Sequence, residues 1–208
     1  MEKLIRKINE LKKTGISNLI GRRLKEFEST GRKKTDWLFS EMCFCMLTAN
    51  FSAERGMHIQ QKLGDKVCTL PERKIADELK KSGHRFPNTR ARYISAASKK
   101  REMIFKALDS IRDEKEKREW IVRNVKGLGY KEASHFLRNI GYKNLAIIDF
   151  HIVDVLADHG IAKRPKTMTK ARYLEIEGKL QELGKKTGMN MAELDLYLWY
   201  LETGKVLK

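Results

Sequence analysis

The sequence predicts an all-α protein, and three observations support that expectation. Strand signals are almost absent from the chain. Apolar residues recur instead at intervals of three or four, as they do along one face of a helix. Only three prolines occur, and none of them interrupts a periodic segment. About ten helices packed on one another are therefore expected in a chain of 208 residues.

The positions of the apolar residues place the helices in order. Two amphipathic helices open the chain, with apolar faces formed by Leu4, Ile8 and Leu11 and then by Leu19 or Ile20, Leu24 and Phe27. Residues 36–49 are apolar nearly all round, which predicts a central buried helix. Further helices are expected near residues 53–64, 72–82, 90–108, 112–124, 131–140, 150–158, 168–185 and 191–203.

Capping residues mark several of these boundaries. Gly83 suits the left-handed position that ends a helix. Asp149 is a good N-cap for the helix that follows it, and Gly160 stands just past the end of that helix. Asn190 and Glu193 form a capping box at the start of the last helix. Neither a repeat nor a flexible linker is visible, so a single unit is expected.

The net charge of +17 indicates a polyanionic partner, and nucleic acid is the commonest one. General solubility, as in thermophilic proteins rich in Lys and Glu, is the alternative. No apolar run approaches the ~20 residues of a membrane helix, and the N-terminus lacks the apolar centre of a signal peptide. A cytoplasmic, nucleoid-associated protein without membrane contact is expected.

The three cysteines do not suggest a cofactor. Cys43 and Cys45 lie inside an apolar helical run, where buried thiols are the favoured interpretation over metal ligands. Together with Cys68 they make an odd number, which argues against a disulfide framework. No Cys or His cluster has the spacing of a metal site, so neither a metal nor another cofactor is expected.

The most informative stretch is residues 122–156, VRNVKGLGYKEASHFLRNIGYKNLAIIDFHIVDVL. A helix is expected to end near Val125, and a second helix begins near Lys131 after a tight turn. Gly127 and Gly129 permit backbone angles that expose several N–H groups at a helix start, and such a turn binds phosphate. An ordinary helical hairpin is the alternative, which the high positive charge disfavours.

This stretch resembles the helix-hairpin-helix of the DNA glycosylase superfamily. A lysine directly after the hairpin marks members with lyase activity, and Lys131 holds that position. Asp149, in AIIDFH, holds the position of the superfamily's downstream aspartate. Many superfamily hairpins carry proline where this chain has Lys126. The resemblance to small 8-oxoguanine DNA glycosylase/AP lyases spans nearly the whole chain, through the segments CFCMLTANFSAE, GHRF, GLGYKEASHFLRN, AIIDFHI and ELDLYLWYLETGKVLK.

The resemblance implies a two-lobed helix-hairpin-helix glycosylase fold without an iron–sulfur cluster, formed by residues 1–208 as one unit. One lobe comprises about residues 32–143, with the hairpin at 122–140. The other comprises about residues 1–31 together with 144–208. The partner is double-stranded DNA containing 8-oxoguanine, and the protein acts as a monomer.

The implied chemistry centres on Lys131 and Asp149. An ordinary lysine has a pKa of about 10.4, so only about 0.04% of it is free amine at neutral pH. Lys131 lies at a helix N-terminus, where the dipole disfavours the ammonium form. The amine then attacks the sugar C1′ and displaces the base. Asp149 stabilises positive charge on the sugar and helps to deprotonate Lys131. A solvated lysine and a simple cap are the alternatives.

Several residues are candidates for handling the DNA. Asn50, with or without Phe51, matches the wedge that contacts the orphaned partner base. A helix cap by Asn50 or Ser52 is the alternative. The basic side chains expected to line a phosphate track are His84, Arg85, Arg90 and Arg92.

Base recognition is expected at four positions. Phe86 either stacks on the flipped base or belongs to the core. Asp195 and Trp199 are four residues apart on one helical face, and a carboxylate beside an indole suits a purine. The resemblance assigns lesion recognition to Lys208, whose α-carboxylate is an acceptor for the N7–H of 8-oxoguanine. Adding residues after Lys208 is expected to weaken lesion excision but not DNA binding.

Two other functions remain open at this point. One is the same chemistry on a different lesion, either an oxidised pyrimidine or a mismatched base. The resembled pyrimidine-acting enzymes usually end in a four-cysteine cluster, which this chain lacks. The other is a non-catalytic DNA-binding module that uses only the hairpin.

Overall fold

The structure, a computed structural model, describes residues 1–208, and its regular structure is entirely helical. The all-α prediction is therefore confirmed. The helices are α1 (Glu2–Lys12), α2 (Ile16–Gly31), α3 (Thr35–Thr48), α4 (Ala53–Leu63), the 3-10 helix η1 (Gly64–Cys68), α5 (Glu72–Lys81), α6 (Pro87–Ser98), α7 (Arg101–Ser110), α8 (Glu114–Asn124), α9 (Tyr130–Asn139), α10 (Phe150–Asp158), α11 (Lys170–Thr187) and α12 (Met191–Thr203). None of them is long and apolar enough to cross a bilayer.

The predicted capping residues cap their helices, but Asn190 and Glu193 lack the reciprocal bond of a full capping box, and one helix boundary was missed. The Asp149 and Asn190 side chains accept hydrogen bonds from Ile152 N and Glu193 N, at 3.1 and 2.9 Å. Gly83 and Gly160 adopt left-handed angles, with φ of 65° and 64°. The single helix expected at 90–108 is wrong, because α6 ends at Ser98 and α7 begins at Arg101. Neither glycine nor proline stands at this break, so the apolar pattern runs through it.

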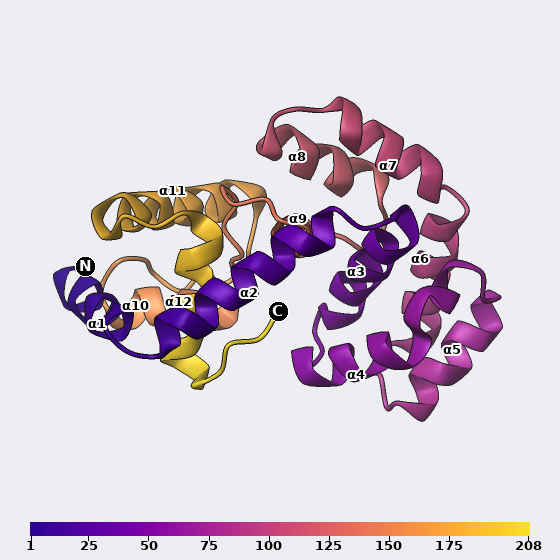
Figure 1. Ribbon diagram of the computed structural model, residues 1–208, viewed down its shortest axis with the longest axis horizontal. Helices are drawn as coiled ribbons and strands as arrows, with labels where there is room; N and C mark the ends of the chain where they lie inside the picture. Colours follow the sequence, from indigo (N-terminus) through magenta and orange to yellow (C-terminus); the bar gives the residue numbers. More distant parts are fainter.

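Two separate hydrophobic clusters form the interior of the molecule. One contains 27 buried residues, all between Phe39 and Leu145. The other contains 21 buried residues, drawn from Leu4 to Phe27 and from Ala146 to Leu198. We refer to helices α3–α9 as lobe one and to α1, α2, α10, α11 and α12 as lobe two (Figure 1). Lobe two is thus assembled from both ends of the sequence.

Helix α3 is the centre of lobe one. Every residue from Phe39 to Thr48 is buried, as the sequence predicted for an apolar helix. Cys43 and Cys45 are free thiols in this helix. Burial raises the pKa of both thiols, which keeps them protonated and unreactive. No group of three His, Cys, Asp or Glu side chains is placed to hold a metal ion.

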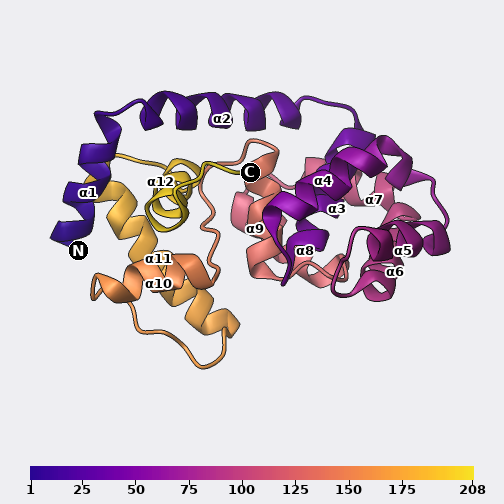
Figure 2. The ribbon, with the colours of Figure 1, turned by 90° about the horizontal axis from the view of Figure 1, so that it is seen from below.

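Helix α2 joins the lobes along one side of the molecule (Figure 2). Its buried residues Ile20 and Phe27 belong to the lobe-two cluster. Its last residue, Gly31, approaches the end of α9 so closely that an added Cβ would lie 2.1 Å from the Ile140 carbonyl oxygen. Only glycine permits this contact, which sets the position of α2 against the hairpin helix.

A buried ion pair fixes the lobes on the other side. Arg118 of α8 donates two hydrogen bonds to the Glu177 carboxylate of α11, at 2.6 and 2.8 Å. The same carboxylate accepts from the Ala146 N–H at 3.0 Å. The rings of Tyr130 and Tyr173 lie 5.1 and 5.6 Å from the guanidinium carbon. Bidentate geometry and the additional Ala146 donor offset the cost of burying both charges, although Arg118 Nε has no partner.

Candidate active site

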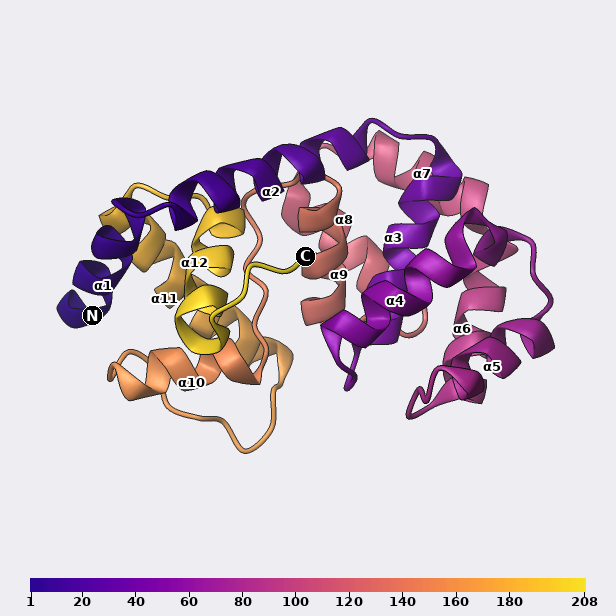
Figure 3. The same ribbon diagram turned by 60° about the horizontal axis from the view of Figure 1, so that its bottom comes forward.

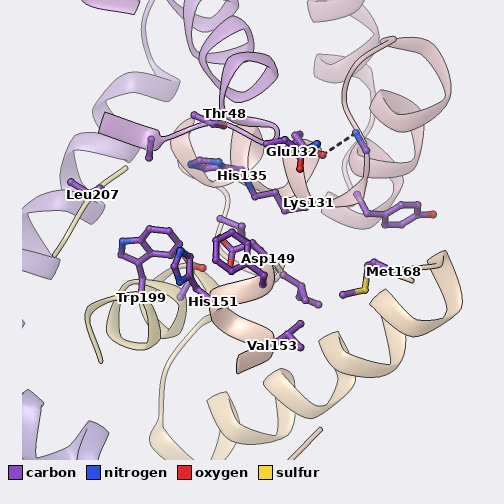
Figure 4. A pocket seen from close by; sticks show the side chains of 18 of the residues that line it. Thr48, Lys131, Glu132, His135, Asp149, His151, Val153, Met168, Trp199 and Leu207 are labelled. Carbon is purple, nitrogen blue, oxygen red and sulfur yellow. Dashed lines mark hydrogen bonds between the residues drawn. The ribbon is translucent and has the colours of Figure 1, made fainter. Parts of the chain in front are cut away.

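A cleft of about 1310 Å³ opens between the two lobes. Residues of both lobes line it, among them nine that the sequence singled out for DNA handling, catalysis or base recognition: Asn50, Phe51, Arg85, Gly129, Lys131, Asp149, Asp195, Trp199 and Lys208. Five other candidates do not line it: His84, Phe86, Arg90, Arg92 and Gly127. Figure 4 shows part of this cleft from close by.

The hairpin forms as the sequence predicted, between the end of α8 at Asn124 and the start of α9 at Tyr130. Gly127 needs to be glycine, because its φ is 99° and an added Cβ would lie 2.6 Å from the Tyr93 ring. Gly129 has an ordinary φ of −87°. Its N–H donates to the Glu132 carboxylate at 3.2 Å. Only one of the two glycines is therefore required by backbone angle.

Lys131 and Asp149 lie in the same cleft (Figure 4). Lys131 belongs to the first turn of α9, and Asp149 is the N-cap of α10. One Asp149 oxygen accepts a hydrogen bond from Ile152 N, so Asp149 both caps α10 and lines the cleft. The charges of both residues influence the ionisation of Asp195, which places the three groups near one another.

Asp195 and Trp199 form one wall of the cleft, on successive turns of α12. Burial raises the pKa of Asp195 to about 6, in spite of its ion pair with Arg138. The nearby negative charge of Asp149 acts in the same direction. The indole N–H of Trp199 is buried without a hydrogen-bond partner. A buried donor without a partner at a cleft wall suits a polar ligand.

His135 is a site residue that the sequence analysis missed. It lies one turn after Lys131 on α9, is 6% exposed and lines the cleft. Burial and three neighbouring cations lower its pKa well below the usual range, so the imidazole is neutral. The ring lies beside the Lys208 backbone, but neither nitrogen has a partner in hydrogen-bond geometry. The spacing of four residues from Lys131 was a signal for it.

Two further aromatic residues at the start of α10 were missed. His151 lies between Phe150 and Trp199, with ring centroids 3.9 and 4.7 Å away. Phe150 is 69% exposed and lines the cleft. Their position directly after Asp149 was the available signal.

Asn50 occupies a strained turn at the edge of the cleft. With φ of 59°, it is the only non-glycine residue with positive φ. It is exposed and does not cap α4, because Ser52 holds the N-cap position and accepts from Arg55 N at 3.5 Å. Phe51 packs its ring on His84 at a centroid distance of 4.3 Å. Sparsely populated backbone angles of this kind cluster at functional sites.

The phosphate-track role predicted for Arg90 is wrong. Arg90 is 8% exposed, and its guanidinium donates to the Ala49 carbonyl at 2.8 Å. His84, also buried, contacts the Leu47 carbonyl through Nε2 at 2.9 Å. Both side chains thus satisfy carbonyls at the end of α3 and support the Asn50 turn. These partners lie 41 and 37 residues away in sequence, beyond any local pattern.

Phe86 also differs from the expectation that it stacks in the cleft. Its N–H donates to His84 Nδ1 at 3.1 Å, and α6 begins at the next residue, Pro87. The ring is 39% exposed and lies outside the cleft, with the Arg85 guanidinium 5.0 Å away. The backbone geometry directs Phe86 outward, so it belongs neither to the core nor to the cleft wall.

Arg92 is exposed beside the hairpin rather than in the cleft. Its guanidinium lies 5.7 Å from the Tyr93 ring, and the Lys126 ammonium lies at the same distance from that ring. Tyr93 in turn packs on Gly127. Two cations therefore flank the turn on which phosphate binding was expected.

Comparison with known proteins agrees with this arrangement. A family model described as 8-oxoguanine DNA glycosylase matches residues 20–189. An 8-oxoguanine DNA glycosylase/AP lyase of Korarchaeum cryptofilum is 51% identical, over 100% of this chain and 99% of the relative. The one from Methanocaldococcus jannaschii is 49% identical, over 99% of both chains.

Solved structures show the same fold. The crystal structure of the Methanocaldococcus jannaschii glycosylase/lyase in complex with a 15mer DNA containing 8-oxoguanine has a TM-score of 0.96 and 48% identity, covering 99% of this chain and 100% of that one. The 8-oxoguanine DNA glycosylase of Thermotoga maritima has a TM-score of 0.92 and 38% identity, covering 100% and 99%.

Proposed function

The chain belongs to the family of 8-oxoguanine DNA glycosylases, and on that premise we propose how its cleft acts in base-excision repair. The enzyme removes 8-oxoguanine from DNA and then cleaves the abasic strand 3′ to the site. The observation that supports this most directly is the meeting of Lys131 and Asp149 in one cleft between the lobes. We also propose that it works as a monomer, since one chain supplies both walls.

Lys131 is the proposed nucleophile. Its free amine attacks C1′, the bond from C1′ to the base breaks, and the base leaves with a proton. The amine then forms a Schiff base with the opened sugar. This iminium acidifies the C2′ proton, and loss of that proton expels the 3′ phosphate by β-elimination. Asp149 stabilises the positive charge that develops on the sugar and accepts the proton that Lys131 loses.

The wall formed by Asp195 and Trp199 reads the flipped base, together with Lys208. The Trp199 ring offers a stacking surface, and the Asp195 carboxylate accepts a ring N–H. 8-Oxoguanine carries an N7–H where guanine has a lone pair, so an added acceptor in the cleft distinguishes the two bases. Lys208 lies on the same cleft and is the proposed source of that discrimination.

Outside the base pocket, three groups of residues hold the DNA. Gly127 and Gly129 shape the hairpin whose amides bind a phosphate, and Arg92 adds positive charge beside it. Asn50 fills the space left by the flipped nucleotide. Arg85 lines the cleft and contacts the backbone near the lesion. The net charge of +17 supplies affinity without regard to sequence.

Borohydride trapping tests the chemistry directly. The wild-type protein is expected to form a covalent adduct with a duplex containing 8-oxoguanine and not with undamaged DNA. Lys131→Gln is expected to abolish the adduct, because an amide cannot form an imine. Lys185→Gln changes an exposed lysine on α11 outside the cleft and serves as the matched control. An adduct that survives Lys131→Gln would show that another lysine is the nucleophile.

A panel of single-lesion duplexes tests the substrate. Excision of 8-oxoguanine is expected to exceed excision of an oxidised pyrimidine or a mismatched base. Faster excision of either alternative would overturn the lesion assignment while leaving the lysine chemistry in place. Binding without any adduct on damaged or abasic DNA would instead indicate a non-catalytic module.

A further inference from the structure

The last residues of the chain cross from lobe two to lobe one. Helix α12 ends at Thr203, and Gly204 turns the chain with φ of 70°. The segment that follows leaves α12 and runs toward α9 (Figure 3). Lys205, Leu207 and Lys208 all line the cleft. We refer to residues 205–208 as the tail segment.

A socket in lobe one receives the Lys208 ammonium. Lys208 Nζ donates to Glu41 Oε1 of α3 and to Gln60 Oε1 of α4, both at 2.6 Å. It also lies 4.7 Å from the centroid of the Phe44 ring. The Lys208 and Glu41 side chains are only 19% and 11% exposed. Two acceptors and an aromatic face around one poorly solvated ammonium make a specific contact.

The socket is held rigidly by its own hydrogen bonds. Gln60 Nε2 donates to Glu41 Oε1 at 2.9 Å, and Asn139 Nδ2 donates to Glu41 Oε2 at 3.2 Å. Asn139 Oδ1 accepts from Arg138, which pairs with Asp195. A continuous chain of buried side chains therefore connects the socket with the proposed base-reading carboxylate.

A second ion pair on the tail segment provides a contrast. Lys205 Nζ lies 2.6 Å from Glu54 Oε1, but these side chains are 54% and 53% exposed. Exposed pairs of this kind contribute little, because water and salt screen them. Val206 packs against the lobe-two cluster, and of the two ion pairs the Lys208 socket is therefore the one expected to fix the end of the tail segment in lobe one.

We propose that Glu41 and Gln60 are positioning residues for lesion recognition, which act by binding the Lys208 ammonium and so holding the tail segment against the base-reading wall. The inference rests on the proposed function. It requires that loss of the socket weakens recognition of the base but spares the reaction of Lys131 with a sugar that has no base. Glu41 and Gln60 take no part in that reaction.

Three full-length variants test the proposal: Glu41→Gln, Gln60→Met and Lys208→Met. Single-turnover excision of 8-oxoguanine is expected to fall about 10-fold in Glu41→Gln and Lys208→Met, as expected for loss of one charge-assisted contact. It falls by a smaller factor in Gln60→Met, which keeps the carboxylate. Imine trapping on a duplex with a preformed abasic site, where no base is read, should stay within about twofold.

A double variant tests whether Glu41 and Lys208 act through the same contact. Glu41→Gln combined with Lys208→Met is expected to be no slower than the slower single variant, because both changes remove the same interaction. Glu54→Gln, which breaks the exposed pair with Lys205, is the matched control and should leave excision unchanged. Gln60 is half-buried at the edge of the network, and Gln60→Met leaves the more deeply buried Glu41 carboxylate in place.

Several outcomes would overturn the proposal. One is unchanged lesion excision in both Glu41→Gln and Gln60→Met. Another is an equal loss on lesion and abasic duplexes, which would indicate a purely structural role. Additive losses in the double variant would show that Glu41 acts independently of Lys208. A wild-type protein that traps on neither duplex would instead refute the proposed function, so the two failures are distinguishable.

Discussion

Two buried arginine–carboxylate pairs join the same two lobes, and they differ in almost every detail. Arg118 and Glu177 meet through two hydrogen bonds, and the carboxylate has a third donor in Ala146 N–H. Arg138 contacts Asp195 through one nitrogen and gives its remaining donors to Asn139. The first pair lies away from the cleft, whereas Asp195 lines it.

On the proposed function, the difference separates a structural pair from one that takes part in base recognition. The Glu177 carboxylate accepts three hydrogen bonds from within the protein and holds the lobes together. A buried carboxylate with one arginine contact retains acceptor capacity, and burial raises the pKa of Asp195 to about 6. Similar residues at one interface thus differ in their access to the cleft, and the recognition role proposed for Asp195 depends on that access.

The largest expected effect comes from breaking the structural pair. Arg118→Met leaves Glu177 buried without its partner, so the free energy of unfolding should fall by about 3–5 kcal/mol. The midpoint temperature should fall by roughly 10 °C. Arg123→Met removes a 74% exposed arginine from the same helix and should change the free energy by less than about 1 kcal/mol. Equal losses in chemical denaturation of the two variants would contradict the comparison.

A smaller effect, on activity rather than stability, is expected from the functional pair. Asp195→Asn removes the carboxylate but keeps the shape of the side chain. Single-turnover excision of 8-oxoguanine should fall about 10-fold, which corresponds to about 1.4 kcal/mol. Trapping on a preformed abasic site should change much less, and the loss of stability should be smaller than for Arg118→Met. If excision were unaffected, Asp195 would be a structural residue like Glu177.

The smallest expected effect is a pH dependence of the wild-type enzyme. Because the pKa of Asp195 is about 6, its carboxylate is mostly ionised at pH 7.5 and mostly protonated at pH 5. Protonation replaces the charged acceptor by a weaker neutral one, so the ratio of lesion excision to abasic-site cleavage should fall as the pH drops through 6. Asp195→Asn should show no such fall in the ratio. A pH-independent wild-type ratio would exclude the ionised carboxylate from base reading.

Local features of the molecule were predictable from the sequence. The hairpin turn at Gly127, the Asp149 cap and the buried helix around Cys43 each depend on residues within one or two turns of helix. Periodicity and capping preferences operate at that range. The break between α6 and α7 was missed, because Lys99 and Lys100 leave the helix without a glycine or proline to mark it.

Long-range pairing was not predictable. From its basic segment, Arg90 is expected to be exposed, but its hydrogen-bond partner is the Ala49 carbonyl, 41 residues away in sequence. Arg138 and Asp195 are 57 residues apart, and Lys208 and Glu41 are 167 apart. Whether a charged side chain faces solvent or a buried partner depends on how the helices pack, and a single sequence does not contain that information in any local pattern.

The assembly of lobe two from both ends of the chain imposes an order on folding. Leu4 and Ile8 share a cluster with Ile20 and Phe27, but the other 17 buried residues of that cluster lie between Ala146 and Leu198. Lobe one, whose core lies within one continuous stretch, is able to bury its apolar surface before synthesis ends. Helices α1 and α2 can pack on α12 only after the C-terminal part of the chain has been made. Lobe two, and with it the second wall of the cleft, is therefore expected to form last.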